Sequence, residues 1–207
     1  MKNLFLFIGL IFALNVTGQT KYQKGMQQGF ALWEQGKMTE ASQLFERISK
    51  AEPENWLPPF YAAQVEILSG FGMKDETKLI AKLKKAQTFL DAAKANSKDN
   101  PEIIIAQALL NLVYISFDGQ KYGMTLSGRN NQLYEQALAI APNNPRVILG
   151  KAEWDMGFAQ YFGKSTKPYC EQIQKAIELG KAEETTVEFY PKFMVERAQE
   201  TLKKCSE

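Results

Sequence analysis

The 207-residue chain contains no histidine, and this absence narrows the chemistry that its side chains can do. Nucleophilic sites built on Ser-His or Cys-His pairs, imidazole general bases and most zinc sites all require histidine. The sequence also lacks a phosphate-binding glycine loop, a Cys-x-x-Cys pair and the spacing of a calcium loop. We therefore expect no cofactor and no metal ion, which leaves carboxylates and two cysteines as candidates.

The best catalytic candidate is Glu153, which lies beside Trp154 and two residues before Asp155. A carboxyl group next to an indole ring can serve as a general acid, and some envelope enzymes that cleave glycans are helical superhelices with one catalytic glutamate. Residues two apart on a helix do not share a face, so Glu153 and Asp155 make a poor catalytic pair. We favour a protein that is not an enzyme and keep the glycan-cleaving enzyme as an alternative.

The two cysteines, Cys170 and Cys205, are candidates for a disulfide. They fall at the start of one expected helix and at the end of the last one, and these positions approach each other if the two helices pack antiparallel. The bridge requires an oxidising compartment. The alternative is two unpaired thiols, one buried and one at the frayed terminus.

The first eighteen residues have the features of a secretory leader. Lys2 precedes an apolar run from Leu4 to Leu14, which is too short for a good membrane anchor, and small residues follow it. We expect cleavage before Gln19, leaving residues 19–207 as a single exported domain, periplasmic or secreted, without a transmembrane span. A net charge of +2 argues against a nucleic-acid partner.

Apolar residues recur at helical spacing through almost the whole mature chain, and no segment alternates strictly as a strand does. Prolines fall where helices should begin or turns should lie. We predict an all-α fold with nine helices at about 22–35, 38–51, 57–70, 76–95, 101–117, 129–141, 145–161, 168–179 and 188–205.

Small and bulky residues recur in two columns along these helices. Alternate helices carry a small residue at one position, and their partner helices carry a bulky one. Close packing of paired helices needs such complementary surfaces. The small column is Gly29, Ala62, Ala106 and Gly150, and the bulky column is Phe45, Leu90, Tyr134 and Ile173.

The pattern resembles the tetratricopeptide repeat. The first unit matches the family's offsets best, through Gly29, Leu32, Gly36, Ala41, Phe45 and Pro53. The resemblance implies helix-turn-helix pairs at about 22–51, 57–95, 101–141 and 145–179, stacked as a right-handed α-solenoid, with a capping helix at 188–205. The early tryptophan of the family is absent from the first unit, and the later units are longer than a standard repeat.

The resemblance also implies a binding function. In this family the first helix of each pair lines a concave face. Such a face suits an adaptor that binds a protein or peptide partner. A structural module without a ligand is a further alternative. The aromatic side chains on these first helices could equally belong to the hydrophobic core. The residues transferred to this face are Gln23, Met26, Phe30, Trp33, Trp56, Gln107, Asn111, Lys151, Trp154 and Phe158.

The extra length of the later units is expected between the two helices of each pair. Three similar segments lie there, at 70–73, 121–124 and 161–164, and each combines an aromatic residue with glycine. Equivalent loops of stacked repeats lie along one edge, where they could contact a partner. We favour the alternative, in which each ring packs under its own loop.

Overall fold

The computed structural model describes residues 20–206, and all regular elements in that range are helices. The predicted leader and its cleavage site lie outside the described residues, so both stay predictions. The helices are α1 (Lys21–Glu34), α2 (Met38–Ala51), α3 (Leu57–Leu68), α4 (Glu76–Asn96), α5 (Pro101–Phe117), α6 (Gly119–Ile140), α7 (Pro145–Tyr161), a 3-10 turn (Lys167–Tyr169), α8 (Cys170–Lys181) and α9 (Val195–Ser206).

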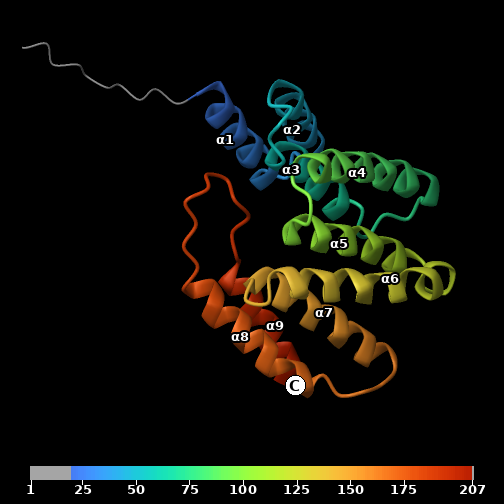
Figure 1. Cartoon of the computed structure of the whole chain (residues 1–207). Coiled ribbons are helices and arrows are strands. Elements are labelled where there is room, and N and C mark those ends of the chain that lie inside the picture. The colour runs from blue at the N-terminus through green and yellow to red at the C-terminus, as the bar shows by residue number, and fades with distance from the viewer. Residues whose placement is uncertain (1–19, 207) are drawn as a thin grey trace, which may run out of the picture.

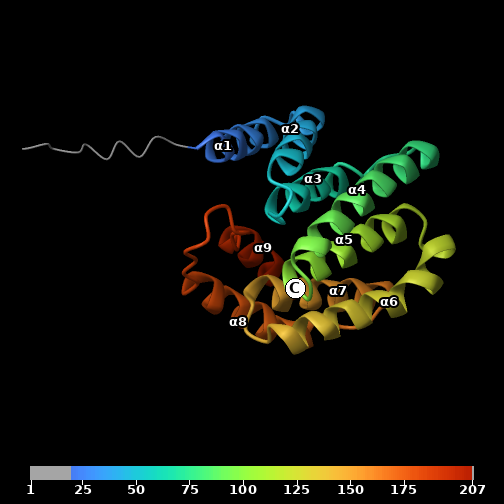
Figure 2. The ribbon, with the colours of Figure 1, turned by 45° about the horizontal axis from the view of Figure 1, so that its top comes forward.

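The helices pack in consecutive pairs, each helix against the next one along the chain (Figure 1). The all-α prediction is therefore confirmed for the described residues, and α9 packs on α8 at the C-terminal end (Figure 2). One hydrophobic core extends from α1 to α5 and a second one joins α7, α8 and α9.

The helix starts follow from short capping sequences. Thr20 and Gln23 form a capping box at α1, and each side chain bonds the other's backbone N–H. Asn100 and Asn144 each precede a proline, and each side chain accepts a hydrogen bond of 2.9 Å from the backbone two residues later. Asparagine at the cap and proline at the first helical position thus start α5 and α7 in the same way.

Two predicted boundaries are wrong. The sixth helix begins at Gly119 rather than at residue 129, because Asp118 ends α5 and also caps α6 by accepting a hydrogen bond from the Lys121 backbone. The segment 121–124 is therefore helical, and the third pair is longer because its second helix is longer. The last helix begins at Val195 rather than at residue 188, because residues 187–190 form a turn, in which the Tyr190 N–H donates a hydrogen bond of 3.1 Å to the Val187 carbonyl oxygen and Phe189 has a φ of 61°.

The predicted columns of small and bulky residues lie inside the molecule. A Cβ atom on Gly29 would lie 2.5 Å from Cε1 of Phe45, so only glycine allows α1 and α2 to approach this closely. A Cβ on Gly150 would lie 3.1 Å from Cε1 of Tyr134, which belongs to the preceding pair. The column residues Ala62, Ala106, Leu90 and Ile173 are buried as well.

Candidate ligand-binding site

A long connection between α8 and α9, residues 182–194, crosses the molecule and reaches the N-terminal helices (Figure 1). We call it the strap. Its start is fixed by Glu183, which accepts two hydrogen bonds of 2.6 and 2.7 Å from the guanidinium group of Arg146. Farther along, Glu188 accepts a hydrogen bond of 2.8 Å from Gln23 of α1. The strap therefore joins the two ends of the helical array.

The tip of the strap inserts Phe189 among aromatic side chains of α1 and α3. Its ring lies 5.6 Å from the ring of Tyr22, edge to face, and 5.9 Å from that of Phe30, nearly parallel. Phe30 in turn contacts Trp33 and Tyr61, with a separation of 4.6 Å between the centres of the Phe30 and Tyr61 rings. We call Tyr22, Phe30, Trp33 and Tyr61 the aromatic cluster.

The backbone at Phe189 is in a conformation that a bulky residue rarely adopts. Its φ of 61° lies in the left-handed region, which costs about 1–2 kcal/mol for a residue with a Cβ. The Tyr61 hydroxyl holds this conformation by donating a hydrogen bond of 2.7 Å to the Phe189 carbonyl oxygen. Burial, followed by the nearby Glu102 carboxylate, raises the pKa of Tyr61, so the hydroxyl stays protonated and able to donate.

The next strap residue, Tyr190, lies against Trp56 and a buried ion pair. Its ring is 6.0 Å from the ring of Trp56, and the Arg146 guanidinium lies 5.3 Å from its centre. Arg146 donates a hydrogen bond of 2.9 Å to Glu102, which is buried and accepts a further hydrogen bond from the Tyr190 hydroxyl. Burial and the Glu102 charge together raise the pKa of Tyr190 to about 12.

One polar atom of the aromatic cluster lacks a partner. The Tyr22 hydroxyl oxygen is buried and has no hydrogen-bond partner among residues 20–206. Burial raises the pKa of Tyr22, although the side chain of Asn55 is near enough to lower it in part. A buried hydroxyl without a partner costs free energy, so a ligand that supplied an acceptor here would gain that hydrogen bond.

The predicted concave face divides into three groups. Gln23, Phe30 and Trp56 contact the strap, and Trp33 lies in the aromatic cluster behind Phe30. Met26, Asn111 and Trp154 are buried instead, which corrects their assignment to an accessible surface. Asn111 donates to the buried Asn130, and the Trp154 indole donates to Asn131, so internal partners satisfy both.

The remaining predicted residues lie apart from the strap. Gln107 exchanges hydrogen bonds of 2.8 and 2.9 Å with Gln87, and Lys151 pairs with Asp155 one turn later on α7. Phe158 is exposed near the C-terminal end of α7. The structure thus gathers only part of the predicted face into one place.

The carboxylates do not form a catalytic pair in the structure. Glu153 accepts hydrogen bonds of 2.7 and 2.6 Å from Arg197 and one from Thr201, which ties α7 to α9. Asp155 is engaged by Lys151. These contacts give both carboxylates a role in packing, Glu153 between α7 and α9 and Asp155 within α7.

Glu66, like Glu102, is a buried carboxylate that lies beside cations. It accepts hydrogen bonds of 2.8 Å from Lys82, 2.8 Å from Lys85 and 2.6 Å from Ser42. Burial alone would raise the pKa of Glu66, but these donors outweigh it and lower the pKa. Its hydrogen-bonding capacity is used within α2, α3 and α4, so we read it as part of the packing.

Cys170 and Cys205 form a disulfide in the structure, with a Cα–Cα distance of 5.7 Å. The bond fixes the end of α9 to the start of α8. Thr166 adds a hydrogen bond of 3.1 Å from its hydroxyl to the Cys205 carbonyl oxygen. Since α8 precedes the strap and α9 follows it, both ends of the strap are anchored to one rigid unit.

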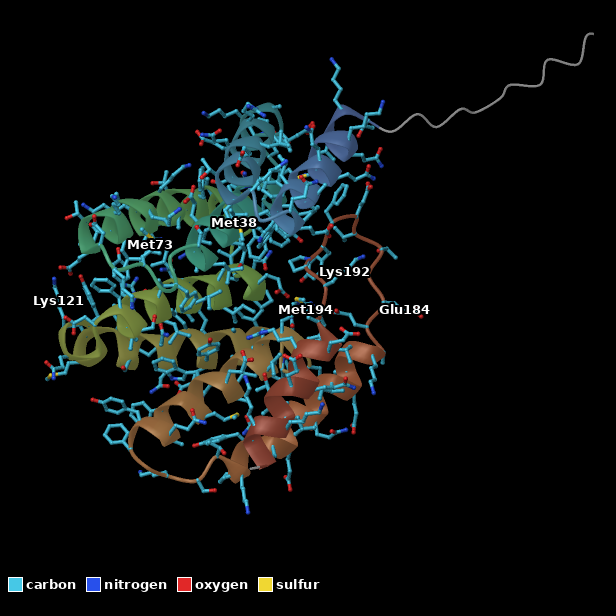
Figure 3. All side chains as sticks on the ribbon, turned by 180° about the vertical axis from the view of Figure 1, so that it is seen from behind. Met38, Met73, Lys121, Glu184, Lys192 and Met194 are labelled. Atoms are coloured by element: carbon cyan, nitrogen blue, oxygen red, sulfur yellow. A yellow bond between two sulfur atoms is a disulfide. The ribbon has the colours of Figure 1, made fainter. Side chains whose placement is uncertain are left out.

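A second group of apolar residues lies on the side opposite the strap. We call Phe71, Met124, Phe158, Tyr161 and Phe162 the apolar edge, and all five are exposed. They come from the α3–α4 connection, the first turns of α6 and the C-terminal end of α7, which lie along one side in Figure 1. In Figure 3, Met73 and Lys121 mark this side, and Glu184 and Lys192 of the strap lie across the molecule from them.

The apolar edge contains the three predicted aromatic-glycine segments, although 121–124 is helical. Gly72 and Gly163 have φ values of 76° and 64°, so glycine does form turns in the other two segments. Tyr161 and Phe162 are 78% and 55% exposed, so these rings do not pack under their own loop, contrary to the reading that the sequence favoured. Tyr122 differs, because its hydroxyl donates to Glu76.

Some aromatic residues of the site could not be identified from the sequence. Tyr61 and the strap residues Phe189 and Tyr190 gave no periodic signal, and residues 188–194 were assigned to the last helix. The available signal was the run Thr-Thr-Val at 185–187 followed by two adjacent aromatic residues and Pro191, which is a poor helix start.

Neither metal chemistry nor a membrane-spanning helix emerges from the described residues. Within residues 20–206 no group of three or more Cys, Asp or Glu side chains is arranged to hold a metal ion. No helix in this range combines the length and the apolar character needed to cross a bilayer.

Comparison with known proteins relates this fold to one solved structure. No protein-family model matches the chain, so the tetratricopeptide resemblance stays at the level of helices packed in pairs, and no curated protein matches it. The HusA haemophore from Porphyromonas gingivalis is similar in structure, with a TM-score of 0.78 and 21% sequence identity. The match covers 91% of this chain and 94% of that chain, so the two share a fold over nearly their whole length.

Proposed function

We propose that this chain is an exported binding protein for a flat tetrapyrrole of the haem class, which enters the aromatic cluster when the strap moves away. The observation that carries the proposal is the position of Phe189. The strap places an aromatic ring, in an unfavourable backbone conformation, against Tyr22 and Phe30. The similar HusA structure is named as a haemophore, which selects the ligand class.

The chemistry of the aromatic cluster suits a ligand with a large flat face. Aromatic side chains bind such faces by offset stacking and by edge contacts, and Phe30 and Tyr61 already form an edge contact. The Tyr22 hydroxyl supplies a polar group that has no partner in the described part of the chain. Because the chain has no histidine and both cysteines are bonded, the usual His and Cys ligands of haem iron are absent, so we assign recognition to the rings.

Export accords with the cysteine chemistry. A disulfide between two elements of the fold persists in oxidising compartments and is rare in reducing ones. The predicted leader points to the same location. We therefore place the protein outside the cytoplasm, where a binding protein would meet its ligand in solution.

Titration with haemin and with metal-free protoporphyrin, followed by absorbance and tryptophan fluorescence, tests the proposal. The Phe189→Gly variant removes the inserted ring while glycine tolerates the positive φ, so we expect both ligands to bind about tenfold tighter. Phe30→Ala should weaken the binding of haemin and of protoporphyrin by a similar factor. Phe162→Ala, a matched ring change on the apolar edge, is the control and should leave both affinities unchanged.

The opposite results would contradict the proposal. Equal affinities for the wild type, Phe189→Gly and Phe30→Ala would place the ligand away from the aromatic cluster. Binding of haemin without binding of metal-free protoporphyrin would assign recognition to the iron instead of the rings.

A protein or peptide partner is the second candidate, and one observation favours it. The strap is itself a non-helical peptide segment that contacts Gln23, Phe30 and Trp56, three residues of the predicted peptide-binding face. A labelled peptide with the sequence of residues 185–193 tests this candidate by anisotropy. Binding to Phe189→Gly, together with no response to porphyrin, would favour the adaptor function over the proposed one.

A further inference from the structure

The apolar edge gathers five of the large apolar side chains that are exposed among the described residues. Met124 is 94% exposed and Tyr161 is 78% exposed, and the rings of Phe158 and Phe162 lie 4.8 Å apart at the end of α7. Exposed apolar side chains that gather on one side of a folded protein can mark an interaction surface.

The acidic and the basic residues around the apolar edge differ in whether their side chains have partners. The acidic residues are engaged: Asp75 and Asp118 cap helices, and Glu76 binds Lys121 at 2.5 Å. Lys74 and Lys164, by contrast, are exposed and make no ion pair within residues 20–206. The ammonium groups of these two lysines therefore have no carboxylate partner among the described residues.

Lys167 adds a further cation on the connection that follows Phe162. It is exposed and its side chain also makes no ion pair among the described residues. Aromatic rings and methionine at the tips of connections, flanked by lysines, are the composition of surfaces that lie in the headgroup region of a bilayer. The rings enter the apolar boundary, and the lysines attract anionic headgroups.

We propose that the apolar edge docks on an anionic lipid surface. The rings of Tyr161 and Phe162 and the side chain of Met124 insert at the headgroup boundary, and Lys74, Lys164 and Lys167 contact the headgroups. In this orientation the strap and the aromatic cluster lie on the side away from the bilayer, because Figure 3 places the strap opposite the edge. The proposal is independent of the ligand assigned to the aromatic cluster.

Vesicle sedimentation tests the docking. The purified chain from Gln19 is mixed with vesicles of phosphatidylcholine alone or with about one quarter phosphatidylglycerol. We expect it to sediment with the anionic vesicles only, and less so as salt screens the lysines. The double variants Tyr161→Ser/Phe162→Ser and Lys164→Glu/Lys167→Glu should each lower the bound fraction at least about fivefold.

Two controls keep the result interpretable. Val187→Ser and Met194→Ser change exposed apolar residues of the strap and should bind vesicles as the wild type does. The edge variants should keep their melting temperature and their affinity for protoporphyrin, so failure of the docking and failure of the proposed function give different results.

Three outcomes would overturn the docking proposal. These are no binding to anionic vesicles, equal binding by the edge variants, and self-association of the wild type that the edge variants abolish. The last outcome would assign the apolar edge to contact with a second copy of the chain.

Discussion

The aromatic cluster and the apolar edge are built from the same residue types, but their exposure differs. Tyr61 in the cluster is 7% exposed, whereas Tyr161 on the edge is 78% exposed. Both tyrosines lie on the first helix of a pair, but Tyr61 packs on Phe45 and Phe60 in the N-terminal core, whereas Tyr161 is the last residue of α7. The strap contacts the cluster through Phe189, and the apolar edge lies across the molecule from the strap. Burial of the cluster therefore comes both from the surrounding helices and from a segment that is distant in sequence.

The largest expected difference between the two regions is in stability. Phe30→Ala should lower the free energy of unfolding by about 2–4 kcal/mol, because it removes a ring that contacts four others in the N-terminal core. Phe162→Ala should change it by less than about 0.5 kcal/mol. Urea denaturation followed by circular dichroism measures both. A similar loss for the two variants would mean that the edge is packed in solution.

Removal of the disulfide should have the next largest effect. Cys170→Ser/Cys205→Ser opens a loop that contains the whole strap, and we expect a loss of about 2–4 kcal/mol. Thermal unfolding with and without reductant measures the loss. Intact-mass analysis under non-reducing conditions is the control, and an absence of the 2 Da deficit expected for one disulfide bond in the wild type would contradict the bridge.

Glycine substitutions compare the packing of the two regions directly. Gly29→Ala should cost about 1–3 kcal/mol, since its Cβ would lie 2.5 Å from the Phe45 ring. Gly157→Ala, beside the apolar edge, meets no atom within 4 Å and should stabilise α7 by about 0.5–1 kcal/mol. Chemical denaturation of the two variants in parallel checks the opposite signs, and a loss at Gly157 would show close packing there.

The smallest predicted effect is on the pH dependence of stability, through Tyr190 of the strap. The pKa of Tyr190 is raised from 10.0 to about 12, so the folded state holds its proton more tightly than the unfolded state. This contribution to stability is complete below pH 10 and is lost as the pH rises towards 12. Tyr190→Phe should therefore flatten the alkaline decline of the melting temperature. If the melting temperature of Tyr190→Phe declined at alkaline pH as that of the wild type does, the decline would come from the titration of other tyrosines.

The helices were predictable because their signals are local. Apolar spacing and the Asn-Pro caps at 100–101 and 144–145 each act within one helix or one turn, and Gly29 acts between two helices that are adjacent in sequence. The start of α6 was missed because Asp118 can end one helix and begin the next without a loop.

The candidate site was only partly predictable, for a physical reason. Gln23, Phe30 and Trp56 were identified from their helical positions, but their contacts come from residues 188–190, more than a hundred positions away. Helical periodicity carries no information about such a contact. Met26, Asn111 and Trp154 were transferred to the same face by the family resemblance, but their side chains are buried among the helices.

Hydrogen–deuterium exchange with and without bound metal-free protoporphyrin tests the central claim most directly, because it reports on both regions in one experiment. We predict faster exchange in residues 187–191 as the ligand displaces Phe189, protection of α1 and α3 around Phe30 and Tyr61, and no change at the apolar edge. Protection confined to residues 120–125 and 158–164, with an unchanged strap, would contradict the account and place the ligand on the apolar edge.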